Sequence, residues 1–288
     1  MTRNKKPAIL FYDIETSPLQ AYMWQLGKQV VRHNQLVHGH SRWGIICITY
    51  CWNDGKPAKI LRMDKHGGTK GQIELFDELV KQADITIGKN SDRFDTKMIN
   101  SARMFAGLKG LPEWTKYTDD LERQMRRYFR LPSMSLDYIS DELGLGGKVK
   151  MCFQDWIDIS DLHKLRQFDL PSTSELNHVS EVLFGEKASA VKKRGMAALE
   201  KMCYYGGKDV EDTRTLWYHL EEHFDHKFNA GVLSSTPGPN CKRCGSANTK
   251  PNGTRMAGKI RYQQYRCGDC HQYAGRAPIT SKTPKSLS

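Results

Sequence analysis

The sequence predicts an α/β fold in which a mixed sheet is flanked by helices, followed by a small C-terminal module held by a metal ion. Short apolar runs with the length of buried strands alternate with longer segments whose apolar residues recur at helical spacing. Four patterned cysteines lie near the C-terminus, after a stretch rich in Pro, Gly and Ser. A chain of 288 residues is long enough for one full domain with a sizeable core plus such a module.

The strands are expected early in the chain and the helices later. Three strand candidates follow one another without an obvious helix, which indicates antiparallel neighbours. In the first expected helix, Ile73, Phe76 and Val80 share one face. We expect strands at 8–14, 45–51, 58–63 and 84–88, helices at 72–82, 95–106, 119–130, 135–143, 188–204 and 208–224, a long loop with aromatic anchors at 17–44, and an insertion or lid at 153–187.

The chain is expected to divide at its breaker-rich stretch. We predict a main domain over residues 1–228, a linker over 229–240, a metal-held module over 241–275 and a disordered basic tail over 276–288. The tail contains too little apolar surface to order itself.

The formal charge of +12 is concentrated at the C-terminal end. Residues 241–288 contain ten Lys and Arg against one acid, Asp269, so they carry +9 and the first 240 residues carry +3. A basic end on a near-neutral body indicates a polyanionic partner, most often nucleic acid, with a solubilising tail as the alternative.

The sequence indicates no membrane association. No stretch approaches the roughly 20 apolar residues of a membrane span. The first apolar run contains two acids, which a secretory signal does not, so we expect a cytoplasmic protein, in the host cytoplasm if it is viral.

Two acids in that first apolar run define the candidate site. Asp13 and Glu15 are two apart in a strand, so their side chains point to the same face. Two carboxylates on a buried strand repel each other and lose hydration unless a cation lies between them. The pair is therefore a candidate site for a divalent metal that prefers oxygen ligands.

Two further motifs complete the pair. Asn90, Phe94 and Asp95 follow the strand at 84–88 and open a helix, in an Asn-x3-Phe-Asp pattern. Tyr205 and Asp209 are four residues apart and share a face if their segment is helical.

The three motifs, in this order, resemble those of the DEDD exonuclease superfamily, which has the ribonuclease H-like fold. Within it, the chain is similar to viral and prokaryotic proteins that begin with Asp-Ile-Glu-Thr and end in a zinc ribbon. The motifs span residues 11–215 and the ribbon adds 241–273, so the resemblance covers most of the chain.

The resemblance implies that two Mg²⁺ or Mn²⁺ ions are bound by four acids, namely Asp13, Glu15, Asp95 and Asp209. Two such cations supply a nucleophilic water and stabilise the leaving oxygen in phosphodiester hydrolysis. The superfamily divides on whether a His five residues before the last Asp, or a Tyr, orients that water. None of the ten histidines has an Asp five residues on, so the resemblance implies the Tyr subtype with Tyr205 in that role.

Other carboxylates compete with these ligands. Asp92 is an alternative to Asp95, although a helix N-cap is its expected role. Residues 119–120 open a helix and are expected caps. Asp137 and Asp141 share a helix face, which we expect to be solvated.

The Tyr motif also has alternatives. If the motif is shifted by one residue, Tyr204 takes the place of Tyr205, although we expect Tyr204 in the core. Asp212 is an alternative to Asp209, but it has no Tyr four residues before it. The pair Gly206–Gly207 interrupts the expected helix, and each Gly in a helix interior destabilises the helix by roughly 1 kcal/mol relative to Ala. Either the helix starts at Lys208, or the glycines let backbone or substrate come close.

Two Cys-x2-Cys pairs, Cys241 with Cys244 and Cys267 with Cys270, predict a structural Zn²⁺ site with four thiolates. So small a segment depends on the metal for its stability. His271 is discounted as a ligand because four sulfurs already complete a tetrahedron. The other cysteines, at 47, 51, 152 and 203, are expected to be plain buried thiols.

Basic and aromatic residues alternate between the two Cys pairs. This mixture suits phosphate contact and base stacking, although zinc ribbons also dock proteins or serve only as structure. The expected nucleic-acid-binding residues are Arg255, Lys259, Arg261, Tyr262, Tyr265 and Arg266.

These features favour a two-metal 3′–5′ exonuclease whose zinc ribbon holds nucleic acid, with single-stranded DNA favoured and RNA as the alternative. Direction and exonuclease action come from the resemblance alone. The rivals are a structure-specific endonuclease on the same fold, a non-catalytic recruitment protein and an RNA-processing exonuclease. A replication or repair protein is a candidate partner, because the chain has no polymerase domain of its own.

Overall fold

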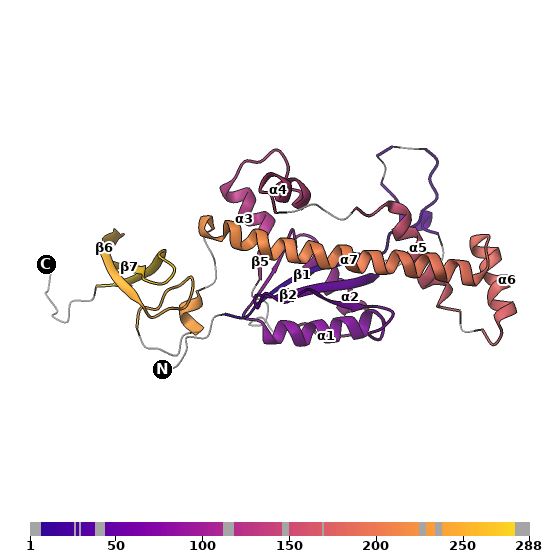
Figure 1. The fold of residues 1–288 in the computed structure, drawn as a ribbon, viewed down its shortest axis with the longest axis horizontal. Coiled ribbons are helices and arrows are strands. Elements are labelled where there is room, and N and C mark those ends of the chain that lie inside the picture. Colours follow the sequence, from indigo (N-terminus) through magenta and orange to yellow (C-terminus); the bar gives the residue numbers. More distant parts are fainter. Residues whose placement is uncertain are drawn as a thin grey trace.

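The computed structural model describes residues 7–25, 27–28, 30–37, 44–111, 118–145, 150–168, 170–224, 229–233 and 238–279. A five-stranded mixed sheet with helices on both faces forms the main body, and a three-stranded antiparallel sheet lies beyond it (Figure 1). The predicted fold class is therefore confirmed. In chain order the elements are β1 (Ile9–Thr16), η1 (His33–Gln35), β2 (Ile45–Trp52), β3 (Lys59–Arg62), α1 (Gly68–Gln82), β4 (Ile85–Gly88), α2 (Asp95–Phe105), β5 (Thr118–Asp120), α3 (Leu121–Tyr128), α4 (Leu136–Glu142), α5 (Phe153–Leu165), α6 (Thr173–Phe184), α7 (Ala188–Leu220), η3 (Glu221–His223), η4 (Ala230–Leu233), β6 (Thr249–Ala257), β7 (Ile260–Cys267) and β8 (Tyr273–Pro278).

The large sheet has the order β3-β2-β1-β4-β5, with β1 at its centre. β1 pairs antiparallel with β2, and β2 pairs antiparallel with β3, as the short connections predicted. β4 and β5 run parallel to β1, because helices return the chain to the same edge between these strands. This is the strand arrangement of the ribonuclease H-like fold.

The two faces of β1 contact different helices. Leu10, Tyr12 and Ile14 point into a core formed with α1 and α2. Ile9 and Phe11 point to the opposite face, where α3, α4 and α7 cover the sheet. Because side chains alternate along a strand, Asp13 and Glu15 lie on this second face, under α7.

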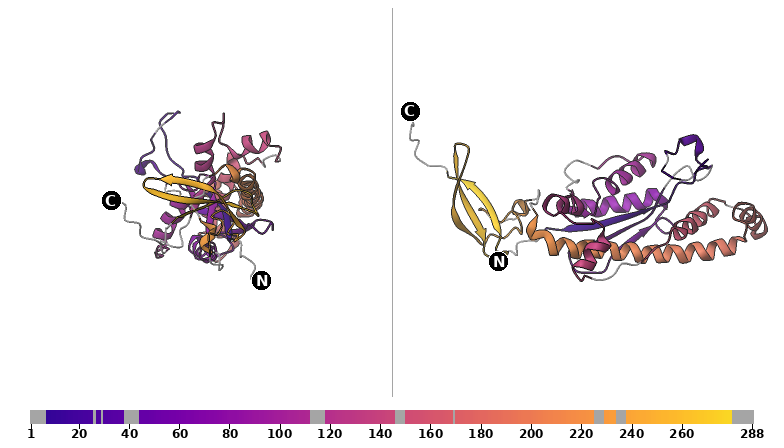
Figure 2. Two further views of the ribbon diagram at one scale, coloured as in Figure 1. Left: turned by 90° about the vertical axis from the view of Figure 1, so that its left-hand side faces the viewer. Right: turned by 90° about the horizontal axis from the view of Figure 1, so that it is seen from above.

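The helix α7 is the longest element and crosses the sheet without a break. It contains 33 residues, which correspond to about 50 Å of helix. The expected division into helices at 188–204 and 208–224 is therefore wrong: the glycines lie inside one helix. Both Figure 1 and Figure 2 show α7 running along the main body, with the small sheet beyond its C-terminal end.

A close approach to the sheet explains Gly206. A Cβ added there would lie 2.9 Å from Cγ2 of Thr49, the residue that pairs with Asp13 in β2. A Cβ on Gly207 would meet only the methyl group of Ala58 at 3.7 Å, an ordinary contact. Of the two alternatives left open by the sequence, close backbone approach is therefore the one observed at Gly206.

The segment expected as an insertion or lid, 153–187, is largely helical, because most of its residues form α5 and α6, which pack along the N-terminal half of α7. Another expectation was wrong. The helix expected from residue 119 begins at Leu121, and residues 118–120 form the edge strand β5. Three residues are too few for a strand pattern to be recognised from sequence.

Part of the expected linker and tail lies outside the described residues, namely 234–237 and 280–288. Within the described part, Ala230 is buried and donates its N–H to the carbonyl of Lys242, at 2.7 Å. β8 includes residues 276–278, so the first residues assigned to the tail form a strand. No helix in the described ranges combines the length and apolar character of a membrane span.

The contrast between the two glycines predicts opposite effects on stability. Gly207→Ala should stabilise the protein by up to about 1 kcal/mol through helix propensity. Gly206→Ala gains the same propensity but forces a methyl group against Thr49, which is buried and stiff at χ1, so a net loss of about 1–2 kcal/mol is expected. Chemical denaturation of both variants measures the difference, and equal midpoints would contradict the close approach.

Candidate functional site

Asp13 and Glu15 are partly buried near the C-terminal end of the central strand. Burial, and then the negative charge of Asp95, raise the pKa of Asp13 well above its ordinary value. Glu15 and Asp209 raise that pKa further, whereas Lys89 lowers it. The carboxylates expected at the site therefore lie close enough to repel one another.

Tyr205 and Asp209 reach this group from α7. Tyr205 is partly buried and donates a hydrogen bond to the carboxylate of Asp209. Burial raises the pKa of the Tyr205 hydroxyl, and the charges of Asp209 and Glu15 raise it further. The hydroxyl consequently keeps its proton at neutral pH and remains a donor.

Asp95 is the first residue of α2 and is 3% exposed. Its Oδ1 accepts a hydrogen bond from the backbone N–H of Ile14, at 3.1 Å, so the residue between Asp13 and Glu15 holds it directly. Burial raises its pKa to about 7, although the hydrogen bonds that it accepts oppose this rise. All five predicted site residues therefore meet around the end of β1.

Lys89 is a charged neighbour that the sequence reading missed. It follows β4 directly and its Nζ lies 3.0 Å from Oε2 of Glu122, with 18% of its side chain exposed. Its positive charge lowers the pKa of Asp13 and of Asp95. A Lys placed directly after a buried strand and before the Asn-x3-Phe-Asp motif was the signal available in the sequence.

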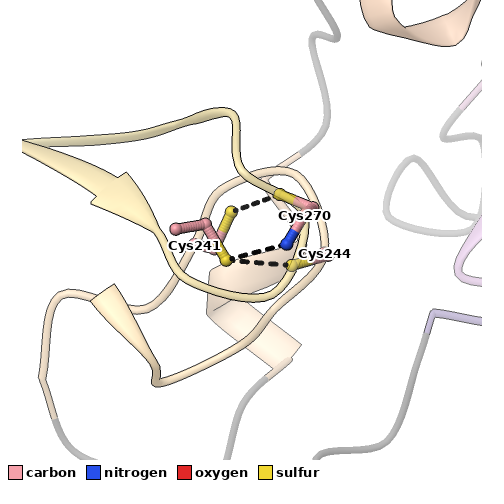
Figure 3. Close-up of side chains that lie close together, drawn as sticks. Cys241, Cys244 and Cys270 are labelled. Atoms are coloured by element: carbon pink, nitrogen blue, oxygen red, sulfur yellow. Dashed lines mark hydrogen bonds between the residues drawn. The ribbon is translucent and has the colours of Figure 1, made fainter. Parts of the chain in front are cut away.

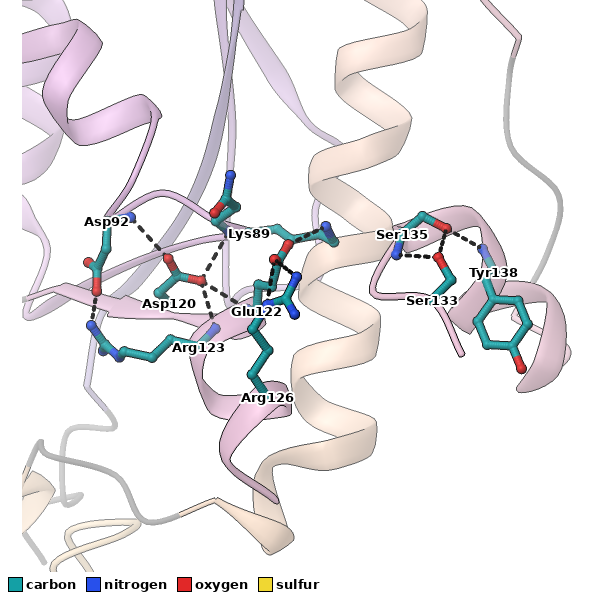
Figure 4. A network of polar contacts seen from close by, with 10 residues as sticks. Lys89, Asp92, Asp120, Glu122, Arg123, Arg126, Ser133, Ser135 and Tyr138 are labelled. Atoms are coloured by element: carbon teal, nitrogen blue, oxygen red, sulfur yellow. Dashed lines mark hydrogen bonds and ion pairs between the residues drawn. The ribbon is translucent and has the colours of Figure 1, made fainter. Parts of the chain in front are cut away.

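Asp120 holds the turn that carries Asp95 (Figure 4). Its carboxylate accepts backbone N–H groups from Asn90 and Asp92, each at 3.0 Å. It also caps α3 by accepting from the N–H groups of Glu122 and Arg123. The expected cap is thus confirmed for Asp120, whose side chain also fixes the turn before α2, whereas Asp119 accepts hydrogen bonds from the side chains of Arg123 and Gln124 instead.

The competing residues lie elsewhere. Asp92 does not cap α2; it forms an ion pair with Arg123 instead. Asp212 pairs with Lys208, at 3.1 Å. Tyr204 is 67% exposed rather than buried in the core, so that expectation was wrong.

On α4, Asp137 and Asp141 are exposed, as expected of a solvated helix face.

Among the cysteines outside the zinc motif, Cys152 is exposed, contrary to the expectation of a buried thiol, whereas residues 47, 51 and 203 are buried.

The donor set at the end of β1 fits a hard divalent cation. It offers oxygen ligands only, and the mutual repulsion at Asp13 is what a bound cation would relieve. Within the described ranges, no three acidic side chains bring oxygens within 4.8 Å of one another. Cation binding therefore requires these side chains to turn toward a common centre.

The four cysteines are already gathered in the geometry of a metal site (Figure 3). The Sγ atoms of Cys241 and Cys270 are 3.7 Å apart, and those of Cys244 and Cys267 are 3.6 Å apart. Tetrahedral coordination with bonds of about 2.3 Å places sulfurs about 3.8 Å apart. The cluster therefore fits one Zn²⁺.

Other groups of the module support the cluster. The N–H groups of Asp269 and Cys270 point at Sγ of Cys267, at 3.4 and 3.5 Å. Gly245 adopts φ +75° directly after the first Cys pair, in the left-handed region that favours glycine. Asp269 accepts hydrogen bonds from Ser246 and from a second polar residue, Asn248, and so ties the two loops together.

The expected nucleic-acid residues of the module divide between two faces of β7. Tyr262 and Tyr265 are three residues apart, so they point to opposite faces. Arg255 lies opposite Tyr262, and Arg276 of β8 lies over the Tyr262 ring at 4.4 Å. Arg261 is on the other face, where it donates to Thr254.

The remaining expected residues and one cleft complete the module. Arg266 donates to the carbonyl of His271, and Lys259 is exposed in the β6–β7 turn. A cleft of about 620 Å³ lies beside β7 and β8, with Tyr265, Tyr273 and Lys242 in its lining. Tyr273 and Lys242, like Arg276, lie outside the basic and aromatic run between the Cys pairs and were missed for that reason.

Comparison with known proteins gives a distant structural similarity. No known protein-family model matches the chain, and no curated protein matches its sequence. The family B DNA polymerase from the hyperthermophilic archaeon Pyrobaculum calidifontis is similar in structure, with a TM-score of 0.48 and 13% identity. The match covers 75% of this chain and 25% of the polymerase, so the chain spans about a quarter of that protein. A likeness this distant carries no information about activity.

The cysteine geometry predicts one tightly bound zinc per chain. Cys241→Ser with Cys244→Ser should abolish zinc retention and unfold the small sheet, because the cluster supplies much of its stability. Cys152→Ser, which removes an exposed cysteine outside the cluster, is the matched control and should keep its zinc. Metal analysis after gel filtration measures this; stoichiometric zinc in the double variant would contradict the site.

Proposed function

We propose that this protein is a metal-dependent nuclease of the DEDD superfamily, Tyr subtype, that removes nucleotides from the 3′ end of a nucleic-acid strand, with DNA favoured. The convergence of Asp13, Glu15, Asp95 and Asp209 beside Tyr205 is the observation that carries the proposal. Direction and exonuclease action rest on the resemblance of the three motifs.

The proposed roles follow from chemistry. Two divalent cations bound by the four acids would supply a nucleophilic water and stabilise the leaving oxygen. Tyr205, kept protonated by burial and negative neighbours, orients the attacking water through its hydroxyl. The backbone N–H of Ile14 binds Asp95 to the strand that carries Asp13 and Glu15. This hydrogen bond fixes the position of Asp95 relative to the other two acids.

Two rivals remain testable. A structure-specific endonuclease would use the same carboxylates on the same fold, but it would also cut a circular single strand, which has no end. A non-catalytic recruitment protein has no reason to keep four mutually repelling acids and a Tyr together. The carboxylate cluster therefore favours catalysis over recruitment.

Single substitutions at the acids and at Tyr205 should show whether the protein is a nuclease and which residues catalyse hydrolysis. Asp13→Asn and Asp209→Asn should reduce hydrolysis of end-labelled strands to background while the fold persists, because repulsion is relieved. Tyr205→Phe should lower kcat by roughly 10²–10⁴-fold, as for a positioned proton-transfer group. Tyr204→Phe is the control and should stay near wild type.

The measurement is product release from single-stranded and duplex DNA and RNA with Mg²⁺, Mn²⁺ or EDTA, together with a circular single strand. Near wild-type turnover in either Asn variant would refute the two-metal assignment. Cleavage of the circle would favour the endonuclease, and a larger loss for Tyr204→Phe would place the Tyr role one residue earlier.

We further propose that the chain divides into a nuclease domain over 1–228, a linker over 229–240, a zinc ribbon that extends from 241 to the end of β8 at Pro278 and a basic tail after it, and that the ribbon binds nucleic acid. Six residues are proposed to contact it: Arg255, Lys259, Arg261, Tyr262, Tyr265 and Arg266. Their exposed cations and the paucity of acids in this segment support phosphate contact. Because Arg276 already covers one face of the Tyr262 ring, we expect charge to contribute more than stacking at that position.

The ribbon proposal predicts a change in salt dependence. Replacing Arg255, Lys259 and Arg261 together with Ala should lower the slope of log Kd against log salt by up to about 2 for a single strand, because three phosphate contacts release fewer counterions. Replacing Lys65, Lys70 and Lys81, which are exposed on or near α1, removes the same charge as a control. Equal slopes in the two triple variants would refute specific phosphate contact by the ribbon.

A further inference from the structure

A structured arm leaves the candidate site directly after β1. The N–H of Ser17 donates to the carbonyl of Gly44 at 2.9 Å, and Gly44 returns a hydrogen bond to the Ser17 hydroxyl, which closes the base of the arm. Above the base, Ala21 and Leu36 form an isolated antiparallel bridge. Residues 17–25 and 30–37 therefore run beside each other as an arm, seen as the indigo loop in Figures 1 and 2.

The outer part of this arm exposes large apolar side chains. Trp24 is 98% exposed, Val30 is 90% exposed and Tyr22 is 73% exposed. The backbone beneath them is ordered, because the N–H of Tyr22 donates to the carbonyl of Gln35 at 2.8 Å. Apolar groups held in water on an ordered support mark a binding surface rather than part of a core.

The charge of the arm selects the kind of partner. Between Thr16 and Gly44 the sequence contains no Asp or Glu, whereas Lys28 and Arg32 are exposed on the arm. Cations interleaved with aromatic rings form the surface that binds single-stranded nucleic acid, through phosphate contacts and base stacking. Because the arm carries no acids, it does not repel phosphates, which favours a polyanionic partner.

The position of the arm ties it to the carboxylates. Ser17 is two residues from Glu15, so the base of the arm lies beside the acids and a nucleic-acid strand bound at the acids can extend along the arm. The two runs of the arm pair at Ser17 with Gly44 and again at Ala21 with Leu36, so Trp24 lies beyond both pairings, at most roughly 30 Å of extended chain from Glu15. The arm is therefore placed to contact nucleotides several positions away from those at the acids.

We propose that this arm binds the unpaired part of the substrate strand, with Tyr22 and Trp24 stacking on bases and Lys28 and Arg32 contacting phosphates. The proposal rests on the proposed nuclease function and specifies its substrate as single-stranded. Stacking is tolerant of sequence because every base has a π-face, so the arm selects strand form and length rather than sequence.

The test is binding of 5′-fluorescein oligothymidylates of four to twenty nucleotides to the full-length, zinc-loaded protein in EDTA-free buffer with Ca²⁺, measured by anisotropy. Trp24→Ala should weaken binding of the twenty-mer by roughly 5- to 100-fold, with a loss that grows with strand length, and Trp24→Phe should restore most of it. Phe105→Ala is the matched control, because Phe105 is 78% exposed at the end of α2 far from Asp95. It should bind like wild type.

The outcomes separate the arm from the nuclease. Unchanged affinity of Trp24→Ala for the twenty-mer would overturn the proposal and assign the arm to a protein or another partner. An equal loss at all lengths without rescue by Phe would also overturn it, since it would show a structural role. Length-dependent loss with Phe rescue supports the arm even if the wild type hydrolyses no strand in Mg²⁺ or Mn²⁺, in which case the nuclease proposal alone would fail.

Discussion

The repulsion among carboxylates at the end of the central strand is the constraint on which the rest of the site depends. Asp13 faces Asp95, Glu15 and Asp209 in a partly buried setting, which disfavours the ionised form of Asp13 and raises its pKa. Lys89 offsets part of this repulsion, but its Nζ is also engaged by Glu122. The remaining negative charge is held in place by the fold, and a bound divalent cation would relieve it.

The surrounding structure holds these groups together at several points. The N–H of Ile14 binds Asp95, Asp120 fixes the turn before α2, and Gly206 lets α7 approach β2. The acids come from three separate elements, so their convergence depends on backbone positions rather than on side-chain reach. The long uninterrupted helix then places Tyr205 and Asp209 over β1 while its other half packs on α5 and α6.

Local patterns made much of this fold predictable. The alternation Asp-Ile-Glu fixed the shared face of Asp13 and Glu15, and the helical spacing of four placed Tyr205 with Asp209. What failed depended on tertiary contacts. From sequence alone Gly206 is expected to break the helix, and only the structure shows that it packs against Thr49. Tyr204 is expected in the core, but it lies on the side of α7 that is open to solvent.

The same limit applies to the smaller features. The Cys-x2-Cys spacing sufficed for the sulfur cluster, because a metal site is defined by few residues. The basic and aromatic run of the ribbon could not reveal that Tyr262 and Tyr265 face opposite ways until the strand was known. Lys89 was missed because its position directly after a buried strand does not show which acids it faces, and only the sheet brings it to Asp13 and Asp95.

Calorimetric titration of the zinc-loaded, full-length protein with Mn²⁺ tests the central claim most directly, since it measures cation binding without requiring any substrate. If the carboxylate cluster is a site for two divalent cations, two Mn²⁺ ions should bind per chain, and the unfolding temperature should rise with Mn²⁺ concentration because the cations bind only the folded state. No binding at millimolar Mn²⁺, or no change in the unfolding temperature, would contradict it.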